Sequence, residues 1–177
     1  ENFRKSLYYG LDLTKFWART NFIEPLHCEN LAYTMRGLMY FSDGTDYVDR
    51  VIEKLGYPES DGTHPRRYNA ALAAECRDKA IQELTAKGVT FPVGVDYYIK
   101  AGNQAQLDSA IVLSEIFDEV GDNYVKLNIK TYTSSASKEV YQPGLHSITG
   151  NGWGADYGDV ENFLGQEVLG NDSAYYY

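Results

Sequence analysis

The sequence predicts an α/β fold with an open, largely parallel sheet flanked by helices. Residues 93–99 and 125–129 alternate apolar and polar side chains, as half-buried strands do. Residues 103–120, between them, have a helical period. A strand, a helix and a strand in succession form a βαβ unit, whose strands are parallel and whose crossover is right-handed. Because 177 residues suit one domain, we expect 1–177 to be a single α/β lobe.

Helical patterns fill the part of the chain before the first strand. Asn2 is expected to cap a first helix, Asp12 a short second one and Asp46 a third, which Gly56 ends. The periodicity is lost over residues 21–45, which indicates a long connection.

The second half is more regular. Asn69 is expected to cap a long helix that ends before Gly88, and residues 134–141 fit one more short helix. A further strand is expected over 145–152. The helix at 103–120 is expected to turn four side chains inward, namely Leu107, Ile111, Ser114 and Phe117.

Composition excludes some classes of protein. The net charge is −9 and the basic residues are scattered, so we expect no nucleic-acid partner. No apolar run approaches the roughly 20 residues that span a bilayer. The chain does not begin with Met and opens directly into helical pattern, so we expect a processed or excised piece of a longer protein. Cys28 and Cys76 are expected to be two unrelated thiols.

The usual signatures of catalysis are missing from the sequence. It contains neither a phosphate-binding glycine loop nor a serine in a nucleophile elbow. The three histidines, His27, His64 and His146, lie far apart, and a metal site at His27 and Cys28 would need two more ligands. We therefore expect no catalytic residue, no metal and no cofactor.

Residues 152–159 are of another kind, because they follow the last expected strand. Open α/β sheets bind ligands at the carboxyl ends of their strands. Gly152 and Gly154 would let an extended chain approach the backbone, Trp153 offers a flat apolar surface, and Asp156 offers a charge to a cationic group. A core role for Trp153 and a turn-forming role for Asp156 fit the residues equally well.

Two acids in this segment allow one enzymatic alternative. Asp156 and Asp159 could act together as the acid and base of a carbohydrate hydrolase. Asp159, however, stands directly before Val160, Phe163 and Leu164, which makes it the expected N-cap of a short helix.

Three motifs resemble the family 5 extracellular solute-binding proteins, the oligopeptide- and dipeptide-binding components of ABC importers. The family has a strand ending in Trp-x-Ala-Asp-Tyr, then a second acid and an aromatic-Leu pair. This sequence has Trp153-Gly154-Ala155-Asp156-Tyr157, then Asp159 and Phe163-Leu164. Residues 3–12 look like the family's Arg-x-Ala-Leu-x-x-Ala-Ile-Asp helix, and residues 69–88 resemble its helix closing in Leu-x-x-x-Gly.

The resemblance implies the second lobe of a two-lobed, type II periplasmic-binding-protein clamp, with the first lobe absent from this sequence. It implies an extended short peptide between the lobes, with the backbone of Gly152 and Gly154 pairing with it. Asp156 would accept its α-ammonium, with Trp153 and Tyr157 beside it. It also implies a monomer outside the cytoplasm, periplasmic or a cell-surface lipoprotein, that works with a membrane ABC permease.

The ligand class has one alternative within the family. Relatives of similar sequence take up sugars, and Trp153 together with the many tyrosines could stack on sugar rings. The acid at Asp156 favours an amine-bearing ligand, so a peptide is the leading expectation.

Overall fold

The computed structural model describes residues 1–150, 154–168 and 170. The chain divides into two compact units, Glu1–Cys28 with Glu59–Thr149 (unit 1) and Glu29–Pro58 with Gly150–Tyr177 (unit 2). The expectation of a single lobe remains a prediction.

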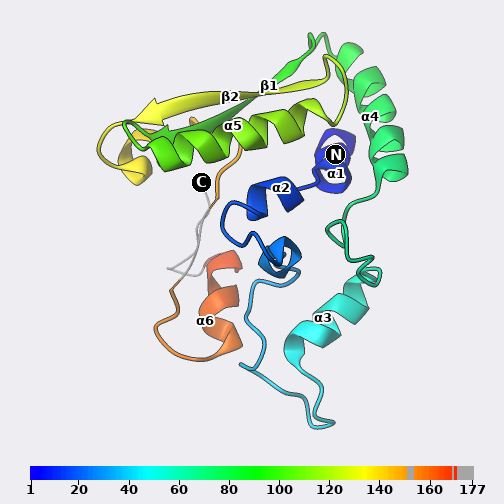
Figure 1. The fold of residues 1–177 in the computed structure, drawn as a ribbon, viewed down its shortest axis with the longest axis vertical. Coiled ribbons are helices and arrows are strands. Elements are labelled where there is room, and N and C mark those ends of the chain that lie inside the picture. The colour runs from blue at the N-terminus through cyan, green and yellow to red at the C-terminus, as the bar shows by residue number, and fades with distance from the viewer. Residues whose placement is uncertain (151–153, 169, 171–177) are drawn as a thin grey trace. The chain divides into compact units, whose positions relative to one another are not determined.

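Unit 1 is built on a two-stranded parallel sheet (Figure 1). Strands β1 (Val93–Lys100) and β2 (Val125–Tyr132) pair in parallel with Val93 opposite Val125, and α5 (Gln104–Asp118) connects them. The predicted βαβ unit is therefore confirmed. The other elements of unit 1 are α1 (Asn2–Gly10), α2 (Thr14–Trp17), α4 (Ala70–Thr85) and the short turns η1 (Pro25–Cys28) and η2 (Ser137–Tyr141).

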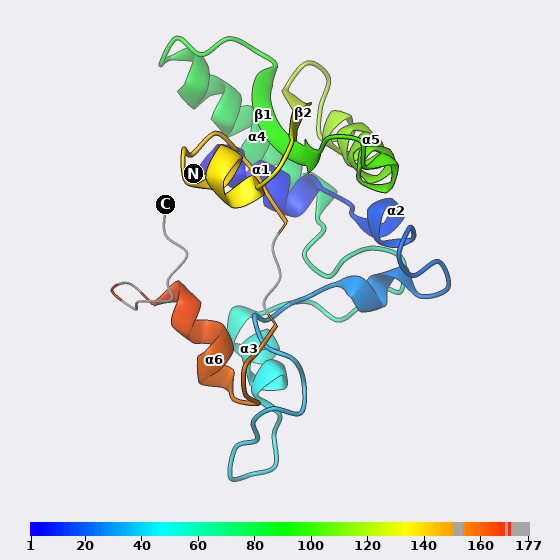
Figure 2. The ribbon, with the colours of Figure 1, turned by 90° about the vertical axis from the view of Figure 1, so that its left-hand side faces the viewer.

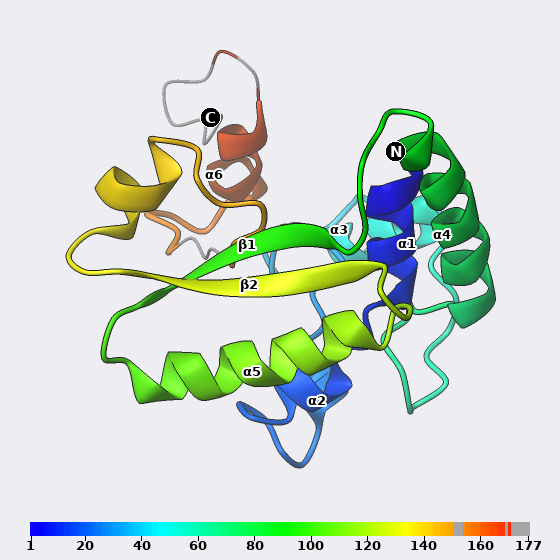
Figure 3. The ribbon, with the colours of Figure 1, turned by 90° about the horizontal axis from the view of Figure 1, so that it is seen from above.

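One face of the sheet and helix α5 enclose the core of unit 1. Figure 3 shows α5 running along the strands, and α1 beside α4 at one end of the sheet. The alternating strand residues Val95, Ile99, Val125 and Leu127 are buried, as their period predicts. A larger cluster surrounds them and includes Leu11, Ala80, Leu113, Ile116, Phe117, Val120 and Tyr124.

The inner face of α5 differs from the predicted one. Of the four side chains expected inside, only Phe117 is buried, whereas Ile111 is 45% exposed and Leu107 and Ser114 are half-buried. The buried side chains are Ala110, Leu113, Ile116 and Phe117. Because Ala110 has only a methyl group, the helix can lie close to the sheet along this stripe.

Helix α1 joins the core through a buried polar contact. Ser6 is fully buried, and its hydroxyl lies 2.7 Å from the carbonyl of Phe3 and 2.8 Å from the hydroxyl of Tyr124. Since the Ser6 proton goes to Phe3, the Tyr124 hydroxyl donates to Ser6 Oγ. Burial raises the pKa of Tyr124 above its ordinary value.

Side-chain caps begin the longer helices. Asn69 accepts from the N–H of Leu72 and begins α4, as predicted. Asn103 accepts from the N–H of Gln106 and begins α5. The cap expected at Asn2 is wrong: Glu1 precedes α1 without a side-chain cap, and Asn2 Nδ2 donates to Glu83 at 2.6 Å instead.

The strand expected over 145–152 is wrong for its described part, because residues 145–150 are not extended in a ladder. This segment meets the outer edge of β1 at one point. The N–H of Ser147 donates to the carbonyl of Asp96 at 2.9 Å, and Ser147 Oγ accepts from the N–H of Asp96 at 3.0 Å. The Ser147 hydroxyl thus takes the place of the backbone carbonyl that a paired strand would offer to the N–H of Asp96. No ladder forms between this segment and β1.

Unit 2 contains α3 (Tyr47–Leu55), α6 (Val160–Leu164) and the turn η3 (Gly165–Glu167) (Figure 2). Asp46 caps α3 through the N–H of Val48, and Gly56 ends it with φ 67°, both as predicted. No helix in the described part of the chain is long and apolar enough to cross a membrane.

Candidate functional site

The loop before α6 carries the described part of the predicted ligand site. Asp159 Oδ1 accepts from the N–H of Glu161 at 2.8 Å, which confirms Asp159 as the N-cap of α6. Val160 and Phe163 are buried and anchor that helix. The loop residues 154–159 are all exposed.

Asp156 lies in this loop with its carboxylate facing solvent. Its backbone N–H donates to Asn162 Oδ1 at 3.3 Å, so the adjoining helix holds the backbone. The carboxylate itself makes no hydrogen bond or ion pair with any residue in the described ranges. Its charge is therefore available to a ligand cation.

The neighbours of Asp156 are held differently. The Tyr157 hydroxyl donates a short hydrogen bond to the Glu161 carboxylate, which raises the pKa of Tyr157. A Cβ built on Gly154 would meet no described atom within 4 Å, so this side of the backbone is open. Gly152 and Trp153 lie outside the described residues.

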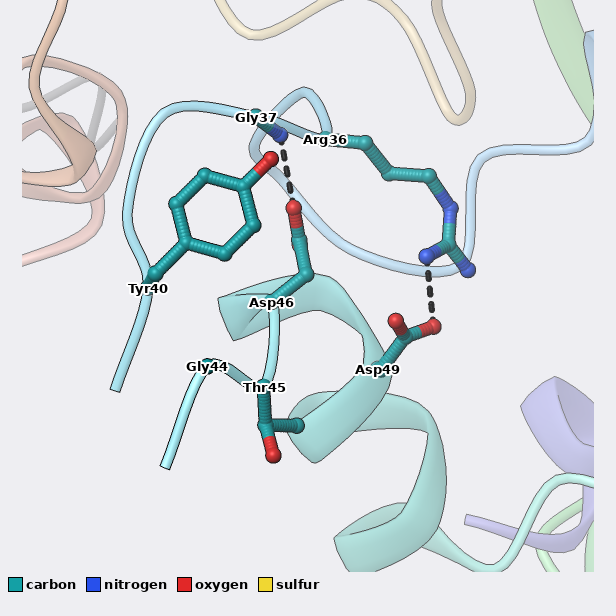
Figure 4. A pocket seen from close by; sticks show the side chains of 7 residues that line it. All are labelled: Arg36, Gly37, Tyr40, Gly44, Thr45, Asp46 and Asp49. Atoms are coloured by element: carbon teal, nitrogen blue, oxygen red, sulfur yellow. Dashed lines mark hydrogen bonds and ion pairs between the residues drawn. The ribbon is translucent and has the colours of Figure 1, made fainter. Parts of the chain in front are cut away.

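A second feature of unit 2, missed by the sequence analysis, is an open pocket of about 680 Å³ (Figure 4). Its wall is mainly polar and consists of Arg36, Gly37, Tyr40, Gly44, Thr45, Asp46 and Asp49. They come from the aperiodic connection and the start of α3, where apolar periodicity gives no signal. The turn glycines and the cap at Asp46 were the only hints in the sequence.

Hydrogen bonds and an ion pair fix the walls of this pocket. Arg36 Nη1 lies 2.5 Å from Asp49 Oδ1, and the N–H of Gly37 donates to Asp46 Oδ2 at 2.7 Å. The Gly37 bond, together with that of Val48, holds the pKa of Asp46 below its usual range. The carboxylates of the pocket are thus already satisfied by the protein.

Each histidine considered for chemistry has a neighbour of its own. His27 pairs with Glu24, His64 with Asp61, and His146 packs edge-on against Tyr141. Within residues 1–150, 154–168 and 170, no cluster of three or more His, Cys, Asp or Glu side chains could hold a metal ion. Cys28 and Cys76 are free thiols, as expected.

Comparison with solved structures defines the class of the fold. The pheromone receptor PrgZ matches with a TM-score of 0.64 and 15% identity, over 98% of this chain and 31% of that one. A peptide-binding protein of a peptide ABC transporter matches with a TM-score of 0.60 and 17% identity, over 98% and 69%. An oligopeptide ABC transporter protein from Bacillus anthracis matches with a TM-score of 0.57 and 20% identity, over 96% of this chain and 30% of that one. The chain thus has a mixed α/β fold with a small parallel sheet that matches part of these proteins.

Comparison of sequences finds a similar oligopeptide-binding protein. The oligopeptide-binding protein AliB, from two strains of Streptococcus pneumoniae, is 25% identical over 93% of this chain. The chain spans only 27% of the length of that relative. No protein-family model matches the sequence. The chain is a partial match to the oligopeptide-binding proteins of solute-binding protein family 5.

Proposed function

We propose that the chain is one lobe, the second, of a two-lobed type II clamp that binds extended short peptides for an ABC importer. The partial match to AliB and the likeness to part of PrgZ support this proposal. On the same grounds the protein acts as a monomer without catalytic residues or a cofactor. It lies outside the cytoplasm, in a periplasm or as a cell-surface lipoprotein, and delivers its ligand to a membrane permease.

The observation that carries the choice of ligand is the exposed, unengaged carboxylate of Asp156. The loop backbone is held at Asn162 and by the Asp159 cap, so binding at Asp156 needs less ordering of the backbone. We assign to Asp156 the α-ammonium of the peptide. Gly152 and Gly154 are proposed to pair with the peptide backbone, and Trp153 and Tyr157 to flank it.

The enzymatic alternative has less support. A hydrolase would need both Asp156 and Asp159 free to exchange protons. Asp159 is committed to the N-terminus of α6, where its Oδ1 accepts from the N–H of Glu161. Sugar binding without catalysis remains the second ligand class.

The test is Asp156→Asn in the full-length protein that carries this chain, titrated with one peptide in its free and its N-acetylated form. In a closed clamp the ion pair is desolvated, so removing either charge should weaken binding by about thirty- to several-thousand-fold. Acetylation should cost the wild type as much as the substitution does, and should cost Asp156→Asn little more.

Asp159→Asn is the matched control, since it alters an equally exposed acid three residues away and should leave peptide affinity within a few-fold. If acetylation leaves wild-type affinity unchanged, Asp156 is not an ammonium receptor. Titration with oligosaccharides would then decide the ligand class.

A further inference from the structure

Unit 2 exposes an unusual run of apolar side chains at residues 33–41, which we call the methionine segment. Both methionines of the sequence lie in it, Met35 and Met39, with 61% and 37% of their surfaces exposed. Three aromatic residues in the same segment are also exposed, namely Tyr33, Tyr40 and Phe41. Large exposed apolar patches mark surfaces that bind something.

Backbone hydrogen bonds hold the C-terminal end of the methionine segment, at residues 39–41. The carbonyl of Met39 accepts from the N–H of Tyr47 at 2.9 Å, and the N–H of Phe41 donates to the carbonyl of Thr45 at 2.9 Å. The Phe41 ring stacks on Tyr47 at 6.5 Å. The exposed side chains of Met39, Tyr40 and Phe41 therefore stand on a backbone that is joined to the N-terminus of α3.

The methionine segment is continuous with the candidate ligand loop. A Cβ built on Gly158 would lie 3.9 Å from Cδ2 of Leu38, so the loop that carries Asp156 and Tyr157 passes against the middle of the segment. Both belong to unit 2. Tyr157, the residue before Gly158, is itself 53% exposed.

The exposed methionines of the segment favour contact with apolar groups of varied shape. Methionine is unbranched and polarisable, and it adapts to side chains of different outline. The charged groups beside it are engaged within the protein: Arg36 pairs with Asp49, and Asp46 accepts from Gly37 and Val48. Arg50, which lies 5.6 Å over the Phe41 ring, pairs with Asp43 and Glu53. A peptide with charged or small polar side chains would gain little here, whereas Leu, Ile, Val or Phe side chains would bury apolar area.

We infer that the methionine segment receives the side chains of the bound peptide and restricts the ligands to peptides rich in apolar residues. This inference rests on the proposed function and names its substrate class. The occupant is a side chain of the same peptide whose α-ammonium binds Asp156.

The experiment compares two peptides of equal length with free N-termini, one carrying Leu and Phe and the other Ser and Asn in their place. The full-length wild type should bind the apolar peptide at least tenfold more tightly. The double variant Met35→Gln, Met39→Gln keeps the side-chain length but adds polar groups, so it should lose about tenfold for the apolar peptide and little for the polar one.

Leu55→Gln is the matched control, because Leu55 is an apolar side chain of unit 2, 63% exposed, at the end of α3 and outside the segment. It should change neither affinity. Equal wild-type affinities for the two peptides would overturn the inference while acetylation could still support peptide binding. If the methionine double variant has a lower melting temperature and loses affinity equally for both peptides, another part of the protein covers the segment and the inference is wrong. If the double variant changes the oligomeric state, a second copy of the protein covers the segment and the inference is likewise wrong.

Discussion

At the scale of single residues, the hydrogen bond between Ser6 and Tyr124 gives a direct test of a buried polar contact. It is buried, and it ties α1 to the residue that precedes β2. Tyr124→Phe removes a donor but leaves the Ser6 proton on the Phe3 carbonyl, so we expect a cost of about 1 kcal/mol. Ser6→Ala strands a buried phenol without its acceptor, which should cost about 1–3 kcal/mol.

Urea unfolding of both single variants and the double variant checks this ordering. The double variant should be less destabilised than the sum of the two, because the same hydrogen bond is removed in each. A larger cost for Tyr124→Phe than for Ser6→Ala would contradict the assigned direction of the bond.

At the scale of elements, α5 offers a paired test of the observed helix face. Ile116 is 1% exposed and Ile111 is 45% exposed on the same helix. Ile116→Ala should cost about 2–5 kcal/mol through lost burial and a cavity, whereas Ile111→Ala should cost about 0.5 kcal/mol or less. The measurement is the free energy of unfolding from denaturant curves. Similar losses for the two variants would be at odds with the packing described.

The same helix shows how far the sequence predicts the fold. The strong alternation at 93–99 and 125–129 predicts both strands, because a core face needs period two. The helix between them predicts their parallel pairing. On α5 two faces carry apolar residues, one with Ile111 and one with Ala110. Hydrophobicity favours the face with Ile111, but the small side chain of Ala110 lets the other face lie closer to the sheet. Ser6 is missed because its burial depends on Tyr124, far away in the chain, and not on its own hydrophobicity.

The candidate site is predictable to a smaller degree. The Asp159 cap follows from local spacing, and the structure confirms it. The strand at 145–150 fails because Ser147 and Asp96 make a side-chain contact that no periodicity encodes. The methionine segment lies in an aperiodic connection, and its position beside the candidate ligand loop depends on the contact between Leu38 and Gly158. The sequence does not predict this tertiary contact.

At the scale of the whole chain, the core and the candidate site belong to different units. The buried cluster is in unit 1, while Asp156, Tyr157 and the methionine segment are in unit 2, in which few side chains are buried. Unit 2 therefore offers surface for binding more than it offers stability. This division suits a protein whose ligand is held from a second side.

One prediction concerns the isolated chain 1–177. Since a clamp shares its contacts between two lobes, one lobe alone should bind the test peptide only in the millimolar range, against a micromolar range for the full-length protein. A micromolar dissociation constant corresponds to a binding free energy of about −8 kcal/mol, and half of that energy corresponds to a millimolar one. Calorimetry on both proteins, with a thermal melt to show that the fragment is folded, measures it. Micromolar binding by the fragment would contradict the half-site.

The Ser147 contact on β1 also has a consequence for self-association. The edge of a sheet is a template onto which another chain can add a strand, and proteins block such edges to avoid aggregation. Ser147 occupies both the N–H and the carbonyl of Asp96 on that edge, and the Asp96 carboxylate is bound to Lys130 at 2.6 Å. A second copy could not extend the ladder past this point without displacing Ser147. The Ser147 contact thereby blocks strand addition at the Asp96 position on the edge of β1.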